Sequence, residues 1–273
     1  MTNNGIDFSR LRKQLHERGV FCLRSFLPRD KVIAAREATR ERMQEAGIWD
    51  GSLWQTQHLQ GEPINAGAKL GRKLKGCEEF DNLVQNEIPL VVAELLVQQP
   101  TFVGMKVPQP LFTLPNATEW QVPHNVWHLD VPRFPNCDIP GVQVFTFLET
   151  VKPEGGGTLV VAGSHRMLNN VEERMSSKDV KQKLKKEPYF RELMSKHTTN
   201  RNQFMRSALQ CGDVKLQVVE MHGEPGDVYF VDLRTLHTPA PNATSVPRIM
   251  LTRRYFLESI REQFYAPAKT TAA

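Results

Sequence analysis

Short β-type runs separated by glycine and proline clusters fill the second half of the chain and constrain its fold more than any other feature. The runs are rich in β-branched and aromatic residues, which favour strands, and they span 102–107, 142–148, 157–161, 214–219, 227–231 and 248–255. Turn-forming residues separate them at 153–157, 223–226 and 239–242. Many short strands with this punctuation are typical of a jelly roll. We therefore expect a jelly-roll core over residues 101–165 and 211–258.

The N-terminal part, residues 1–100, favours helices. Apolar residues recur at helical spacing in 7–18, residues 29–46 are rich in strong helix formers, and 78–98 carries one apolar face. A short strand is expected at 19–23, and the glycine-rich stretch 51–76 is expected to be irregular.

A polar, helix-prone insert at 166–210 interrupts the strands. No internal repeat is visible, so we predict one domain over residues 1–273. The expected fold class is mainly β with flanking helices. It would be a double-stranded β-helix, that is, a cupin-like jelly roll, with N-terminal helices and a helical insert.

Composition excludes several functional classes. Hydrophobic residues make up 40% of the 273 residues and charged residues 24%, an ordinary globular balance. No apolar run is long enough to cross a bilayer, and the first residues lack the pattern of a secretory signal. Four cysteines without a Cys-x-x-Cys pair favour free thiols in a reducing compartment. We expect a cytoplasmic protein with no membrane association.

The net charge of +5 is partly local, because six lysines lie between residues 178 and 196. Acidic residues are interleaved among them, which favours a solvated helix face. The alternative interpretation is a basic rim that attracts an anionic substrate. No recognition motif accompanies the charge, so we expect no nucleic-acid partner.

A His-x-Asp pair, His128 and Asp130, is the first chemical signal. On a strand, residues i and i+2 point to the same side, so both side chains can reach one point. Strands distant in sequence lie side by side in a jelly roll, and His237 follows as a third candidate. Two histidines and one carboxylate form the facial triad of non-heme iron sites, which leaves positions open for a cosubstrate and O2. Taken singly, each residue is more often a core or surface group than a metal ligand.

Arg248 strengthens the interpretation. It follows His237 across a proline-containing turn and begins the last strand. A guanidinium forms a planar fork that binds a carboxylate at two points. A buried arginine needs an anion, because an unpaired buried charge is very costly. The alternative is an ordinary surface salt bridge.

Several ordered motifs together resemble the phytanoyl-CoA dioxygenase family of Fe(II)/2-oxoglutarate-dependent oxygenases. They lie at 18–27, His128-Leu129-Asp130, 154–166, Gly226-Asp227-Val228, Leu236-His237 and Arg248. The resemblance covers roughly residues 7–256, and the insert at 166–210 matches poorly. It implies a double-stranded β-helix in which His128, Asp130 and His237 bind iron and Arg248 holds 2-oxoglutarate.

The resemblance also implies the reaction. The cofactors would be Fe(2+) and 2-oxoglutarate, with O2 as cosubstrate. An unactivated C–H bond of a small-molecule metabolite would be hydroxylated, or otherwise oxidised, with succinate and CO2 as coproducts. The carboxylate of Asp130 favours hydroxylation over halogenation, because related halogenases carry a small residue there. A free small molecule and a CoA thioester both remain possible substrates.

Further residues are candidates for supporting roles. Thr113, on a strand, is a candidate contact to 2-oxoglutarate. His124 shares strand parity with His128 if the strand extends that far, and Phe145 faces one side of its strand, so both are candidate substrate contacts. Gly163-Ser164-His165 is interpreted as a structural turn, and His165 as a ligand is the minor alternative. The insert, with the loops at 51–76 and 131–140, is expected to form the substrate rim.

Two other functional classes compete with the oxygenase. A different metal-dependent cupin-type enzyme, such as an isomerase or cofactor-independent dioxygenase, usually has more histidine ligands and no arginine placed like Arg248. A non-catalytic barrel that binds a ligand has no need for the whole set of His128, Asp130, His237 and Arg248. The oxygenase is therefore the favoured prediction.

Overall fold

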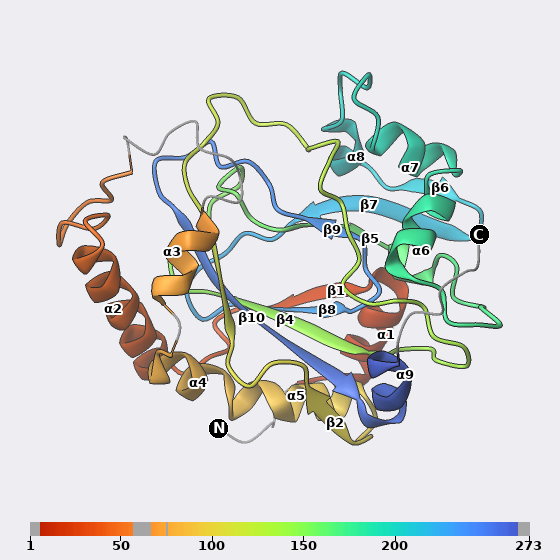
Figure 1. Cartoon of the computed structure of the whole chain (residues 1–273), viewed down its shortest axis with the longest axis horizontal. Helices are drawn as coiled ribbons and strands as arrows, with labels where there is room; N and C mark the ends of the chain where they lie inside the picture. Colours follow the sequence, from red (N-terminus) through yellow and green to blue (C-terminus); the bar gives the residue numbers. More distant parts are fainter. Residues whose placement is uncertain (1–5, 57–66, 75, 267–273) are drawn as a thin grey trace.

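Two antiparallel sheets form the centre of the protein in a computed structural model that describes residues 6–56, 67–74 and 76–266 (Figure 1). The larger sheet has the order β1-β8-β4-β10-β2, and β3 also pairs with β10. Its strands are β1 (Val20–Leu23), β2 (Thr101–Val103), β3 (Gln109–Thr113), β4 (Gly141–Phe147), β8 (Val228–Asp232) and β10 (Arg248–Leu257). The smaller sheet has the order β6-β7-β5-β9, with β5 (Leu159–Ala162), β6 (Leu209–Cys211), β7 (Val214–Glu220) and β9 (His237–Thr238).

The chain changes sheet repeatedly along the core. It passes from β4 in the larger sheet to β5 in the smaller, and later from β8 to β9 and back to β10. Side chains alternate between the faces of each strand. Phe145, Phe147, Tyr229 and Met250 of the larger sheet pack with Val160 of the smaller sheet. This interior cluster closes the space between the two sheets. We conclude that the fold is jelly-roll-like.

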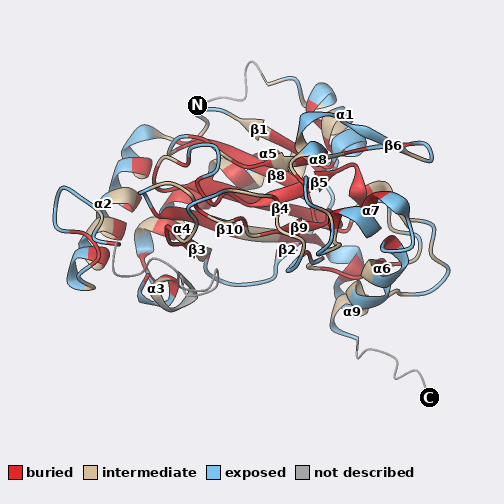
Figure 2. Cartoon of the chain, turned by 90° about the horizontal axis from the view of Figure 1, so that it is seen from above, coloured by how far each residue is buried: buried red, intermediate tan, exposed pale blue. Residues whose placement is uncertain are grey.

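Helices cover the outer face of the larger sheet (Figures 1 and 2). These are α1 (Phe8–Arg18), α2 (Arg29–Glu45), α4 (Glu78–Val84) and α5 (Glu87–Leu95), and α3 (Gly67–Lys73) lies against β3. Their apolar stripes pack with the outward residues of the sheet, such as Val144, Phe230 and Leu251. Figure 2 shows the buried residues concentrated in the strands and on the inner sides of the helices. No helix of the described residues is long and apolar enough to span a bilayer.

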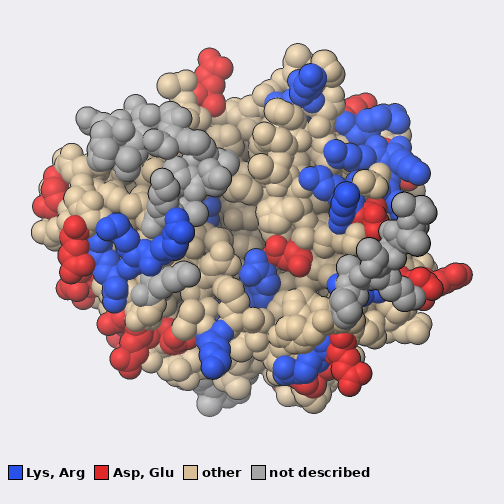
Figure 3. Space-filling view, viewed as in Figure 1, with Lys and Arg blue, Asp and Glu red and all other residues tan. Residues whose placement is uncertain are grey.

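The insert covers the outer face of the smaller sheet. Its helices are α6 (Ser177–Leu184), α7 (Pro188–Leu193) and α8 (Gln203–Arg206). Val180, Phe190 and Phe204 pack with Val161 and Val218 of the sheet. The lysines of α6 point away from this contact, because the buried residues of α6 are Val180 and Leu184. Figure 3 shows basic side chains gathered over the insert, at the upper right of the view.

The structure corrects several local predictions. The predicted helix over 78–98 is two helices, because Pro89 has no N–H and its ring would clash with the carbonyl of Gln85. The stretch 51–76 was expected to be irregular, but it contains α3, which packs against Pro110 of β3. The strand expected over 102–107 ends at Val103. Part of the predicted rim, residues 57–66 and 75, lies outside the described residues.

Candidate metal centre

His128 and His237 lie directly opposite each other at the edge of the smaller sheet. Each backbone N–H donates to the carbonyl oxygen of the other residue, at 2.9 and 3.1 Å. His237 in turn pairs with Val160 of β5. The segment around His128 forms this isolated bridge and not the strand that the sequence predicted. The bridge nevertheless brings the imidazole centroids to 4.2 Å from each other.

Both histidines direct Nε2 to the same space. Nδ1 of His128 lies 2.9 Å from the carbonyl oxygen of Val126, and Nδ1 of His237 lies 3.0 Å from that of Thr235. A carbonyl can only accept, so each Nδ1 carries a proton, and in the neutral form of each ring Nε2 keeps its lone pair. Burial lowers the pKa of His237 to about 4, although Asp130 opposes the shift. His237 is therefore neutral at neutral pH, as a metal ligand must be.

The backbone at Val126 is strained. Its φ is +53°, which is rare for a β-branched residue. This conformation directs the Val126 carbonyl to His128, and strain of this kind is often found at functional sites. The observation adds Val126 to the site, although no sequence pattern pointed to it.

Asp130 completes the group. Its Oδ1 lies 3.8 Å from Nε2 of His128, and its Oδ2 lies 3.6 Å from Nε2 of His237. The ligand atoms of the three residues all lie within 4.8 Å of one another. Burial alone would raise the pKa of Asp130, but the electrostatic interaction with the His237 ring, the charge of Arg254 and a hydrogen bond from Arg254 together lower it below the ordinary value. The carboxylate is therefore ionised at neutral pH.

Two imidazoles and one carboxylate on one side of a point fit a divalent transition metal. The hydrogen bonds from each Nδ1 to a backbone carbonyl are the kind of support that fixes the ring orientation of metal-binding histidines. The side chain of His128 is 46% exposed whereas that of His237 is 8% exposed. The group is therefore accessible from the His128 side.

Arg254 was missed by the sequence analysis. Its Nε and Nη2 lie 2.7 and 2.6 Å from Oδ2 of Asp130. The alternation of side chains along a strand could have identified it, because Arg254 lies on the same face of β10 as Arg248, Met250 and Thr252. Met250 of this set packs in the interior cluster between the sheets.

Arg248 is buried at the start of β10, opposite Thr113 of β3. Its Nη2 donates to Oγ1 of Thr113, Nη1 contacts the sulfur of Met250 at 3.7 Å, and Nε has no hydrogen-bond partner among the residues that the structure describes. Burial lowers the pKa of Arg248 to about 10, so the group is still a cation at neutral pH. Among the described residues no carboxylate pairs with it. A buried cation with a free donor fits an anionic ligand.

The remaining candidates lie in different surroundings. Phe145 is 2% exposed within the interior cluster, where it packs beside the other aromatic residues between the sheets. His124 lies in a bend outside any strand, so the parity argument for it does not apply.

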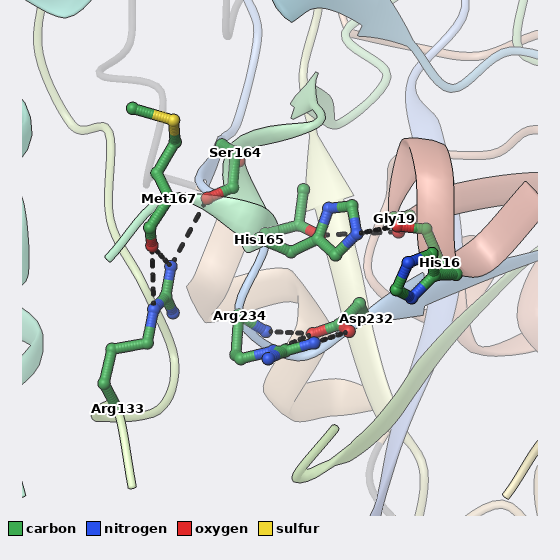
Figure 4. A network of polar contacts seen from close by, with 9 residues as sticks. His16, Gly19, Arg133, Ser164, His165, Met167, Asp232 and Arg234 are labelled. Carbon is green, nitrogen blue, oxygen red and sulfur yellow. Dashed lines mark hydrogen bonds and ion pairs between the residues drawn. The ribbon is translucent and has the colours of Figure 1, made fainter. Parts of the chain in front are cut away.

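His165 has a structural role. Its Nε2 donates to the carbonyl of His16 at 2.8 Å, and Gly19 permits the approach because a Cβ there would lie 2.4 Å from the ring (Figure 4). Ser164 Oγ accepts from the backbone N–H of Leu236, next to His237. The Gly-Ser-His turn therefore supports the loop that carries a triad histidine. This agrees with the structural interpretation of the turn.

A small cavity adjoins the triad. It has a volume of about 190 Å³, and its lining includes Asp130 and Arg254 beside Met105, Val107 and Phe256. Met105 and Val107 are also exposed, at 44% and 43%. Figure 3 shows one face of the molecule with a hollow near its centre and with acidic and basic side chains beside the hollow. Polar groups therefore meet an apolar surface next to the triad.

Comparisons with known proteins identify the family of this chain and structures that are similar to it. The family model for phytanoyl-CoA dioxygenase (PhyH) matches residues 15–250. Among solved structures, the chain is similar to the non-heme alpha ketoglutarate dependent carbocyclase SnoK from nogalamycin biosynthesis, with a TM-score of 0.57 and 18% identity over 94% of this chain and 86% of that one. No curated relative matches the sequence.

Two further structures share the fold. The epimerase SnoN, in complex with Fe3+, alpha ketoglutarate and nogalamycin RO, gives a TM-score of 0.54 and 17% identity over 97% of this chain and 91% of that one. AviO1 from Streptomyces viridochromogenes Tue57 gives 0.51 and 17% over 97% and 99%. With the family model covering most of the sequence, the chain belongs to the phytanoyl-CoA dioxygenase family of iron- and 2-oxoglutarate-dependent oxygenases.

Proposed function

We propose that the protein oxidises an unactivated C–H bond of a small molecule, with His128, Asp130 and His237 as the iron ligands. The observation that carries the proposal is the triad itself, in which the Nε2 atoms of two histidines and one ionised carboxylate are directed to one space. When bound, iron and 2-oxoglutarate supply the oxidising power for the reaction with O2, with succinate and CO2 as coproducts. Hydroxylation is the proposed outcome.

Arg248 and Thr113 are proposed to bind one carboxylate of 2-oxoglutarate. The guanidinium is buried and positive and has a free Nε, so a carboxylate there would gain charge-assisted hydrogen bonds. Thr113 holds the guanidinium through its hydroxyl group. The two residues would fix the orientation of 2-oxoglutarate toward the triad.

The interior cluster has a separate role in the proposal. Phe145, Phe147 and Met250 fill the space between the sheets, and this would limit the access of water to the reacting atoms. Phe145 is proposed to line the inner end of the substrate space, and His124 remains a candidate contact at its outer side. The sheet order, in which the chain alternates between two sheets, supports a double-stranded β-helix as the framework.

The binding of 2-oxoglutarate together with the metal distinguishes the proposed oxygenase from the two alternative functional classes. A different cupin-type enzyme would bind a metal without 2-oxoglutarate. A non-catalytic ligand-binding barrel would form no complex with Fe(II) and 2-oxoglutarate. We would titrate the protein with Fe(II) and 2-oxoglutarate under anaerobic conditions and follow the visible metal-to-ligand charge-transfer band. His128→Ala removes one ligand, whereas His197→Ala changes an exposed histidine of the insert and serves as the matched control. We expect the band in wild type and His197→Ala only.

The reaction outcome needs a second measurement, because the structural neighbours include a carbocyclase and an epimerase. Candidate substrates would be screened by succinate release and the products weighed by mass spectrometry. Hydroxylation adds one oxygen atom, whereas cyclisation by desaturation removes two hydrogens and epimerisation leaves the mass unchanged. A folded, metal-loaded wild type without the charge-transfer band would contradict the oxygenase proposal itself.

A further inference from the structure

We propose that Arg254 is a positioning residue that fixes the orientation of the Asp130 carboxylate for metal binding. The inference rests on the proposed function, because it assumes that Asp130 is a ligand. It adds a residue that neither the triad nor the 2-oxoglutarate anchor contains.

The contact is close and made by two nitrogens. Nε and Nη2 of Arg254 both approach Oδ2 of Asp130, at 2.7 and 2.6 Å. Oδ1 accepts no hydrogen bond from any described residue, and it is the oxygen nearer to Nε2 of His128. Arg254 therefore occupies one oxygen of the carboxylate and leaves the other free for a metal.

Asp130 has little other support. It follows the isolated bridge at His128 and belongs to no strand, so no backbone ladder holds it. Arg254, in contrast, lies within β10 and is paired on the neighbouring strand with Gln143 of β4. Its Nη1 also lies 3.4 Å from Oε1 of Gln109 on β3. Arg254 thus lies on a well-paired strand of the larger sheet and restrains the carboxylate of Asp130, which lies on an irregular segment.

Charge and geometry act in opposite directions here. A positive charge beside the ligand repels a divalent cation and on its own weakens metal binding. A guanidinium fork that fixes the carboxylate reduces the rotational freedom lost on coordination and strengthens metal binding. The proposal states that geometry dominates. Lysine and glutamine separate the two effects, because lysine keeps the charge without the fork and glutamine keeps a donor without the charge.

The test measures the affinity for Co(II) and its visible ligand-field spectrum, which respond to the metal site without turnover. The variants are Arg254→Lys and Arg254→Gln, and the control is Arg253→Lys. Arg253 is the neighbouring arginine of the same strand, but it lies near Asp81 and donates to the Lys106 carbonyl. We expect about 10- to 100-fold weaker binding and an altered spectrum for Arg254→Lys, as for other residues that support metal ligands. Arg253→Lys should match wild type.

Each outcome has one meaning. Wild-type affinity and spectrum in Arg254→Lys, or tighter binding in Arg254→Gln, would show that only charge matters and would overturn the positioning role. If Arg254→Lys does not fold, Gln109→Leu replaces it and should weaken binding in the same direction to a smaller extent; unchanged binding would then count against the role. His128→Ala tests the triad independently of Arg254. If Co(II) binding is lost in His128→Ala but unchanged in Arg254→Lys, the proposed metal site stands and only the positioning role fails.

Discussion

Arg248 on β10 and Thr113 on β3 are paired across the larger sheet, and the guanidinium donates to the threonine hydroxyl inside the protein. The arginine has no carboxylate partner among the described residues, although it is 4% exposed. Most buried cations are paired with an anion inside the protein. Under the proposed function, a carboxylate of 2-oxoglutarate would be the anion that pairs with Arg248.

Replacing Arg248 by methionine should weaken 2-oxoglutarate binding. Charge-assisted hydrogen bonds contribute about 1.5–3 kcal/mol, so we expect roughly 10- to 150-fold weaker affinity in the anaerobic charge-transfer titration. Fe(II) or Co(II) affinity without 2-oxoglutarate should be unchanged, because Arg248 is not a proposed ligand. Thr113→Val should have a smaller effect in the same direction. Equal 2-oxoglutarate affinity in Arg248→Met and wild type would refute the anchor.

Val126→Asn should stabilise the protein. Asparagine tolerates the left-handed backbone that valine adopts here with φ of +53°. Relief of this strain should raise the free energy of unfolding by about 1 kcal/mol, which corresponds to a melting temperature roughly 2–4 °C higher. Val107→Asn is the matched control, because Val107 is equally exposed, at 43%, without a positive φ. The strain argument fails if both variants melt at the same temperature as wild type.

The buried pair of Asp232 and Arg234 should make stability depend on acid pH. Arg234 donates through Nε and Nη2 to Asp232, at 3.0 and 2.7 Å (Figure 4). Burial alone would raise the pKa of Asp232, but Arg234 lowers it below the ordinary value. The stabilisation is therefore present above about pH 4, the pKa of an unfolded aspartate, and is lost as the pH falls toward the lower folded pKa.

Asp232→Asn measures this contribution. It leaves Arg234 without its charge partner in the interior, which should cost about 3–5 kcal/mol at neutral pH. Urea unfolding from pH 7 to pH 3 should show the gap between wild type and Asp232→Asn narrowing below pH 4. A gap that does not change with pH would mean that the lost stability comes from packing and not from the charge.

Glu220 should produce the opposite pH dependence. Burial raises its pKa to about 7, and the charge of Glu154 adds to the shift. A folded pKa above the unfolded value means that ionisation costs stability as the pH rises from about 4.3 to 7, by up to about 4 kcal/mol. Glu220→Gln should thus unfold at higher urea than wild type at pH 8 but not at pH 4. Glu192→Gln, an exposed control, should match wild type at both values.

The sequence predicted the parts of the fold that carry a local pattern. The β-branched and aromatic runs of β4, β7, β8 and β10 were visible between their turn residues, and so was the apolar stripe of α1. β9 was missed because two residues, His237 and Thr238, are too short to show a period. The helix break before α5 and the helix α3 depend on a proline clash and on packing against β3, which periodicity does not report.

The candidate site was predictable by residue type but not by geometry. His128, Asp130 and His237 were found, although the strand that justified their convergence is only a bridge with His237. Arg254 was missed because its contact joins residues 124 positions apart. The strain at Val126 has no sequence signature, since valine is an unusual residue for a left-handed backbone.

The single bridge between His128 and His237 has a consequence for the dynamics of the protein. Two backbone hydrogen bonds join this segment to the smaller sheet at His128, and a coordinated metal would add a link between the same two residues. Edge segments held by few hydrogen bonds open locally with a small free energy, far below that of global unfolding. The amide protons of His128 and His237 should thus exchange with solvent quickly in the metal-free chain and slowly in the loaded one. The same two residues would bind the metal and report its occupancy.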